Sequence, residues 1–115
     1  MILLYRATTP IHMFWFYSLN PENLYRTIRL TYSQDGSILV EKEKSDLTFG
    51  VTQTSDGSDC YYMASQLTQN EANLFSSESG SPIEIQIRCV DYGGHVDATN
   101  ILRITALDVL NDEVL

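Results

Sequence analysis

The sequence predicts an all-β fold, an antiparallel β-sandwich of the immunoglobulin-like kind with about seven strands. Apolar and polar residues alternate in several segments, most clearly over 83–90, Ile-Glu-Ile-Gln-Ile-Arg-Cys-Val. Successive side chains of a strand point to opposite faces, so this alternation indicates one buried and one exposed face, as in antiparallel sheets. Turn residues interrupt such segments roughly every eight to twelve residues, a spacing typical of sandwiches.

The amino-terminal part is predicted to hold two strands and a turn. The apolar run 2–6 predicts a short strand, which the Thr-Thr-Pro sequence at 8–10 ends. Segment 11–17, Ile-His-Met-Phe-Trp-Phe-Tyr, is aromatic and strongly β-prone. A turn is expected at 20–23, because Pro21 presets φ and asparagine tolerates turn geometry.

Two hairpins are predicted in the middle of the chain. Segments 25–34 and 37–44 both alternate and flank Asp35-Gly36, a strong short-range hairpin signal. Segments 47–52 and 60–67 flank a polar turn at 55–59 and should form the second hairpin.

One short helix is predicted near 68–75. Thr68 and Glu71 have the spacing of a capping box, in which each side chain bonds the other residue's backbone N–H. After the strand at 83–90, a turn at 91–94 leads to a last strand that runs to about 107 and is broken near 97–100.

The length and charge limit the possible functions. The chain has 115 residues, which suits a single sandwich domain over 1–115, and its formal net charge is −8. An excess of acids argues against binding nucleic acid or an anionic membrane surface, since both depend on Lys and Arg. The amino-terminal residues lack the features of a signal peptide, and no apolar run is long enough to span a membrane, so we expect a protein made in the cytoplasm.

We predict no catalytic residue, no cofactor and no metal site. Cys60 and Cys89 could form a disulfide, but two reduced cysteines in or near the core are the expected state. His95 near Asp91 and Asp97 matches no known metal pattern, and such carboxylates at turns are usually solvated. The polar turn at 55–59 superficially resembles a calcium loop but lacks its bidentate glutamate.

The run Glu-Lys-Glu-Lys at 41–44 lies at a strand end. We expect a solvated edge that blocks unwanted strand pairing. A polar contact with a neighbouring subunit is the alternative.

The aromatic segment 11–17 is the most unusual feature of the chain. Phe14 and Phe16 should face one side of the strand, while Met13, Trp15 and Tyr17 face the other. One set can fill the core, so the other needs cover from this domain or from a partner, and both possibilities stay open. We therefore predict interface residues at Met13, Trp15, Tyr17, Val114 and Leu115.

Several stretches carry a resemblance to a known family. They are Leu-Thr-Tyr-Ser-Gln-Asp-Gly at 30–36, Glu-Lys-Glu-Lys-Ser-Asp at 41–46, Leu-Thr-Gln-Asn-Glu-Ala-Asn-Leu-Phe at 67–75, Ile-Gln-Ile-Arg at 85–88, Gly-Gly at 93–94 and Leu-Asn-Asp-Glu-Val-Leu at 110–115. Over residues 25–115 the sequence resembles small phage and prophage structural proteins of Gram-positive and gut bacteria. It departs from their pattern at Asn70, Ala72 and Glu113. It is also faintly similar to the N-terminal β-sandwich of phage upper-baseplate proteins.

The resemblance implies a virion structural protein at the tail or baseplate, assembled through contacts with other virion proteins or with copies of itself. An oligomer in the virion is therefore expected. The alternative is a small acidic phage inhibitor of a host defence protein, of the anti-CRISPR kind, which the charge of −8 favours. A carbohydrate-active or lectin-like domain is a third hypothesis.

Overall fold

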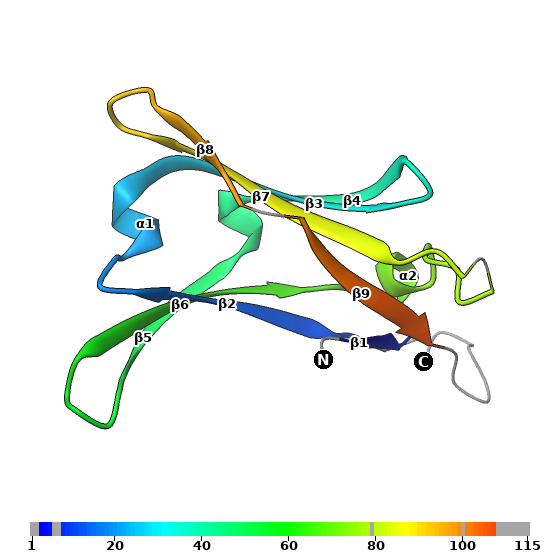
Figure 1. The fold of residues 1–115 in the computed structure, drawn as a ribbon, viewed down its shortest axis with the longest axis horizontal. Coiled ribbons are helices and arrows are strands. Elements are labelled where there is room, and N and C mark those ends of the chain that lie inside the picture. The colour runs from blue at the N-terminus through cyan, green and yellow to red at the C-terminus, as the bar shows by residue number, and fades with distance from the viewer. Residues whose placement is uncertain (1–2, 6–7, 79, 100, 108–115) are drawn as a thin grey trace.

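The computed structural model describes residues 3–5, 8–78, 80–99 and 101–107. Its strands form two layers, with one long side of the sandwich facing the viewer in Figure 1. The larger sheet has the order β1-β9-β7-β3-β4, with β8 pairing to β7, and the smaller sheet has the order β2-β6-β5. The elements are β1 (Leu3–Tyr5), β2 (Ile11–Tyr17), α1 (Pro21–Leu24), β3 (Tyr25–Gln34), β4 (Ser37–Glu43), η1 (Lys44–Asp46), β5 (Thr48–Gln53), β6 (Asp59–Gln66), α2 (Gln69–Ala72), β7 (Ile83–Asp91), β8 (Val96–Ala98) and β9 (Leu102–Leu107).

The strand order confirms the predicted sandwich. In immunoglobulin-type domains one sheet holds strands C, F and G, and the other holds A, B, E and D. Here β3, β7 and β9 take the places of C, F and G, and β2, β6 and β5 take those of B, E and D. The first strand differs: β1 pairs with β9 in the larger sheet, and that pairing is parallel, whereas only antiparallel pairs were expected.

The core fills the space between the sheets as the alternation predicts. Every second residue is buried from Ile28 to Gln34 in β3 and from Ile83 to Cys89 in β7. The largest fully buried side chain is Tyr32, on the strand that corresponds to C, where immunoglobulin domains carry a buried Trp. Leu4, Met63, Leu67 and Phe75 close the core from other elements.

The predicted turns and hairpins are present. Asp35 and Gly36 both have positive φ, 54° and 79°, which is the backbone of the two-residue type I′ turn. β5 and β6 pair antiparallel as the second hairpin, and β8 and β9 are the two pieces of the broken last strand.

The helices agree in part with expectation. The capping box of Thr68 and Glu71 is formed on both sides, and α2 is one turn long. α1 was expected only as a turn; instead Asn20 caps its first turn by accepting the N–H of Glu22. No helix among the described residues is long and apolar enough to cross a membrane.

The expectation of a purely solvated edge at 41–44 is wrong for its lysines. Lys42 Nζ bonds both carboxylate oxygens of Glu71 at 2.9 and 3.0 Å, and its side chain is only 13% exposed. Lys44 lies in η1 and donates to the backbone carbonyls of Glu22 and Tyr25, each at 2.7 Å. The two cations therefore tie the edge of the larger sheet to α2 and α1.

Candidate protein-binding face

The face of the β2-β6-β5 sheet that points away from the larger sheet, called the outer face below, carries the exposed aromatic residues. On β2, Ile11, Met13, Trp15 and Tyr17 are 57, 41, 46 and 72% exposed. Phe14 and Phe16 point the other way and pack against the core. The predicted division of these β2 side chains into two opposite sets is therefore confirmed, and the structure decides which set is exposed, a choice that the sequence left open.

Trp15 is held by a partner on the next strand. It lies opposite Tyr62 of β6, and the two ring centroids are 5.6 Å apart at a tilt of 58°. Tyr62 lies in turn opposite Gly50 of β5, and a Cβ at Gly50 would come within 2.3 Å of the tyrosine ring. Because Gly50 has no side chain, the Tyr62 ring can lie directly against its backbone. Glycines paired with aromatic residues on neighbouring strands are known to allow this close packing.

An open groove of about 660 Å³ lies beside these rings. Its apolar lining includes Ile11, Met13, Tyr62 and Ala64, and Asp46 is the only charged residue of the described lining. The groove extends the apolar surface from β2 across β6 toward the start of α2.

The two sheets differ strongly in charge. Among Asp, Glu, Lys and Arg, the strands of the smaller sheet contain one residue, Asp59. The described strands of the larger sheet contain ten charged side chains: Arg26, Arg29, Glu41, Lys42, Glu43, Glu84, Arg88, Asp91, Asp97 and Arg103. The outer face is therefore an almost uncharged surface on a chain of net charge −8.

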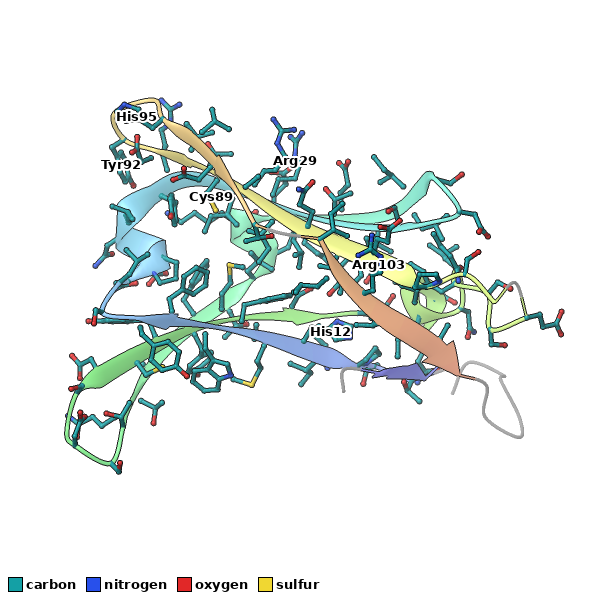
Figure 2. All side chains as sticks on the ribbon, viewed as in Figure 1. His12, Arg29, Cys89, Tyr92, His95 and Arg103 are labelled. Atoms are coloured by element: carbon teal, nitrogen blue, oxygen red, sulfur yellow. The ribbon has the colours of Figure 1, made fainter. Side chains whose placement is uncertain are left out.

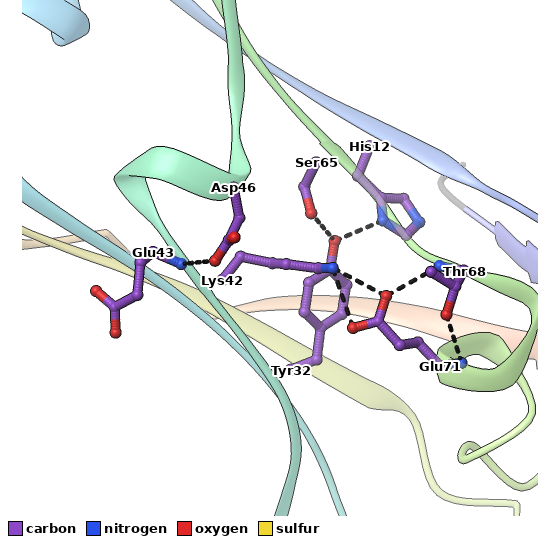
Figure 3. Close-up of polar contacts among 8 residues, drawn as sticks. All are labelled: His12, Tyr32, Lys42, Glu43, Asp46, Ser65, Thr68 and Glu71. Carbon is purple, nitrogen blue, oxygen red and sulfur yellow. Dashed lines mark hydrogen bonds and ion pairs between the residues drawn. The ribbon is translucent and has the colours of Figure 1, made fainter.

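A buried polar network holds β2 on the side that faces the larger sheet (Figure 3). The Tyr32 hydroxyl lies 2.7 Å from His12 Nδ1 and bonds to Ser65 Oγ at 3.0 Å. The Tyr32 hydroxyl thereby joins β3 of the larger sheet to β2 and β6 of the smaller one. Burial raises the pKa of Tyr32 well above its usual range, although the bond to Ser65 opposes this, so the hydroxyl stays protonated.

The Asp91 carboxylate organises the turn that carries His95. Figure 2 shows His95 at the outer tip between β7 and β8, where its side chain is 84% exposed. Asp91 Oδ1 accepts the backbone N–H groups of Gly93 and His95, both at 2.9 Å. Bonds from that backbone lower the pKa of Asp91, which marks the carboxylate as part of the turn.

The turn that superficially resembled a calcium loop is organised in the same way. Asp56 accepts the Thr54 hydroxyl and the backbone N–H of Ser58. These bonds, the one from Thr54 first, lower the pKa of Asp56 to about 2. Within the described part of the chain, no three His, Cys, Asp or Glu side chains lie close enough together to hold a metal ion.

Both cysteines are free and buried. Cys89 belongs to the core cluster, as the alternation of β7 predicts, whereas Cys60 is buried outside it. Burial and then the charge of Asp97 raise the pKa of Cys89 to about 11, so its thiol is protonated and poorly nucleophilic at neutral pH.

The structure brings three of the predicted interface residues together and extends the set. Met13, Trp15 and Tyr17 share the outer face, while Val114 and Leu115 lie outside the described residues. Sequence reasoning missed Tyr62 and Gly50, because their place beside Trp15 depends on which strands pair. The glycine within the β-prone run 47–52 was the one signal that could have indicated a close approach.

Comparison with protein-family models and with curated proteins finds no match for this chain.

Proposed function

We propose that this protein is a non-enzymatic structural protein of a bacteriophage virion, at the tail or baseplate, which assembles by protein–protein contact through its outer face. The observation that carries the assembly function is the row of exposed apolar side chains on an almost uncharged sheet. Contiguous exposed apolar surface on a soluble domain usually marks a contact site. Trp and Tyr are enriched among the residues that dominate binding energy.

The virion location has a different support. It comes from the sequence resemblance over residues 25–115 to small phage structural proteins. A rigid sandwich with tight turns suits such a role, because a pre-organised surface loses little conformational entropy on assembly.

The acidic inhibitor is the less favoured function. An inhibitor that occupies a nucleic-acid channel needs clustered negative charge, yet the acids of the larger sheet are intermixed with arginines. Arg29 pairs with Glu43 at 3.0 Å, and Arg103 pairs with Glu84 at 3.3 Å. The almost uncharged outer face also supplies no negative charge with which to occupy a nucleic-acid channel.

The experiment compares two exposed aromatics in particles of the phage that encodes the chain. Trp15→Glu places a charge in the outer face, whereas Tyr92→Glu places one at an exposed tyrosine on the distant β7–β8 turn. Each variant is supplied in trans, checked for folding by circular dichroism, and quantified by mass spectrometry of purified particles. We expect wild-type and Tyr92→Glu chains in the particles, and Trp15→Glu reduced by about tenfold or more, as for a central interface residue.

Two results would contradict the proposal. If the wild-type chain is not found in purified particles, the virion location is wrong. If capture from host lysate instead yields a nuclease partner, the inhibitor is the better description.

A further inference from the structure

We propose that the edge of β2 that faces away from β6 pairs with β2 of a second copy of the chain, antiparallel and centred on Phe14, so that two three-stranded sheets join into one of six strands. The inference names a partner for the assembly proposed above and rests on that function.

The edge strands of the described sheets differ in how they are protected. β4, at one end of the larger sheet, carries Glu41, Lys42 and Glu43, and its register with β3 shifts between Tyr32 and Ser33. Charges and bulges of this kind hinder the addition of a further strand. β2, at one end of the smaller sheet, has neither: its register with β6 is continuous over all seven residues, and it contains no Lys, Arg, Asp, Glu or Pro.

The place beside β2 is one that the fold normally fills. In immunoglobulin-type domains strand A pairs with strand B in the same sheet. Here β1 pairs with β9 across the sandwich, and in the described part of the chain β2 ends its sheet. Figure 1 shows β2 along the near side of the molecule, with its long edge toward the viewer. Strand addition at such an edge is a common mode of recognition.

The sequence of β2 is complementary to itself in the antiparallel direction. With Phe14 on the two-fold axis, all seven residues have partners. On the outer face Met13 then lies opposite Trp15 of the second copy, and Ile11 lies opposite Tyr17 of the second copy. Aliphatic–aromatic cross-strand pairs and sulfur–ring contacts are both favourable. A shift of one residue would set outward side chains against inward ones.

Charge also favours the smaller sheet as the contact between copies. Two chains of net charge −8 repel each other. That repulsion is smallest where neither copy presents carboxylates, and β2 has none. A second copy therefore fits this edge better than the charged β4 edge of the larger sheet.

The pairing should be weak. The exposed area of the four outward β2 side chains, taken together, equals that of about two fully exposed large side chains. Since an aromatic side chain buries about 200 Å², even complete cover in both copies gives about 800 Å². This is below the ~1,200 Å² of small specific interfaces. The dimer therefore depends on concentration and gains strength when many copies lie side by side.

The first test is the mass in solution of the full chain, by light scattering over a concentration series. We expect the mass to rise from 13.0 kDa toward twice that value. Met13→Lys with Trp15→Lys sets lysine opposite lysine in the proposed register and should weaken dimerisation by about tenfold or more. The control, Thr48→Lys with Thr52→Lys, adds the same charge to β5 at the other edge and should leave the dimer unchanged.

The second test fixes the register by disulfide trapping. Met13→Cys and Trp15→Cys are made in separate chains, oxidised alone and mixed, and analysed on non-reducing gels. Opposed residues bring their Cβ atoms to about 5 Å, whereas diagonal neighbours lie about 7–8 Å apart. Only the mixture should cross-link, and the wild-type chain, whose two cysteines are buried, should not.

The remaining outcomes overturn either the inference or the proposed function, and they tell the two apart. A mass of one chain at all concentrations excludes the dimer, and cross-linking of Trp15→Cys with itself, or of Met13→Cys with itself, excludes the register. If the chain stays monomeric but the Trp15→Glu variant is still lost from particles, this inference fails while the proposed function stands. If the chain dimerises as described yet is missing from particles, the proposed function fails instead.

Discussion

At the residue scale, the outer face depends on a glycine. The Tyr62 ring can pack against the Gly50 backbone because Gly50 has no side chain, and Tyr62 in turn contacts Trp15. Gly50 and Tyr62, on two neighbouring strands, thus set the position of the exposed Trp15 indole. By contrast, the ring of Tyr32, in the buried polar network, is placed by burial and by hydrogen bonds of its hydroxyl group.

Gly50→Ala should move the Tyr62 ring and change the surroundings of Trp15 without unfolding the domain. Alanine in a strand is favoured over glycine by about 0.5–1 kcal/mol, which offsets the displacement of an exposed ring. We expect the free energy of unfolding to change by less than about 1 kcal/mol. Because Trp15 is the single tryptophan, its fluorescence reports the change directly.

Thr52→Ala, on the same strand and face, is the control and should leave the emission spectrum as it is. An unaltered spectrum in Gly50→Ala would show that Tyr62 does not position the indole.

At the scale of the elements, short helices are held by side chains from neighbouring strands. α2 is only one turn long, and a helix of this length is not stable by itself. Its capping box satisfies its first N–H groups, and the ion pair from Glu71 to Lys42 attaches it to β4. Partial burial raises the pKa of Glu71, but the hydrogen bonds from Lys42 and Thr68 outweigh it, so the pKa is lowered overall.

Glu71→Gln should therefore destabilise the domain in a manner that depends on pH. The glutamine keeps the cap but loses the charge, and we expect a loss of about 1–2 kcal/mol at pH 7 by urea denaturation. Because the folded-state pKa lies below the ordinary 4.5, the carboxylate stabilises the fold above that pH, and this contribution is lost as pH falls through the folded-state pKa. The difference between variant and wild type should shrink accordingly in acid.

Glu43→Gln is the matched control, since its ion pair with Arg29 is about half exposed on both sides. Exposed pairs contribute little, so its effect should stay below about 0.5 kcal/mol at every pH. Equal losses of unfolding free energy in Glu71→Gln and Glu43→Gln would contradict a stabilising role for the ion pair between Glu71 and Lys42.

At the scale of the whole molecule, the sandwich separates two kinds of surface. The larger sheet presents mixed charges to solvent, and the smaller sheet presents the outer face. Between them the core is largely apolar, and the buried network of Tyr32, His12 and Ser65 joins the sheets. Buried hydrogen bonds of this kind specify how the two layers are aligned.

Tyr32→Phe removes the hydroxyl that joins the layers while it keeps the ring in the core. His12 and Ser65 each lose that partner in a buried setting, so we expect a loss of about 1–3 kcal/mol in the free energy of unfolding. Tryptophan fluorescence and far-ultraviolet circular dichroism should follow one transition, shifted to lower urea. Tyr92→Phe, at an exposed tyrosine, should leave the midpoint unchanged, and a Tyr32→Phe midpoint equal to wild type would show that the network contributes nothing.

Much of the fold could be predicted because local patterns carry it. The alternation of β3 and β7, the Asp35-Gly36 turn and the Thr68–Glu71 cap each involve residues that are close in sequence. The same holds for the division of the β2 side chains into two opposite sets, which follows from the period of a strand, whereas only the structure shows which set is exposed. Lys42 was misjudged because its partner, Glu71, lies 29 residues away in the chain.

By itself, the sequence determined which segments are strands, where they turn and which side chains of each strand are apolar, because these depend on periods of two and on turn residues. Only the tertiary structure decided that β1 joins the larger sheet, that β2 ends the smaller one, and that Tyr62 and Gly50 lie beside Trp15. The physical reason is that strand pairing is made by backbone hydrogen bonds common to all residues. The choice of neighbour therefore depends on how the whole set of apolar faces is buried together.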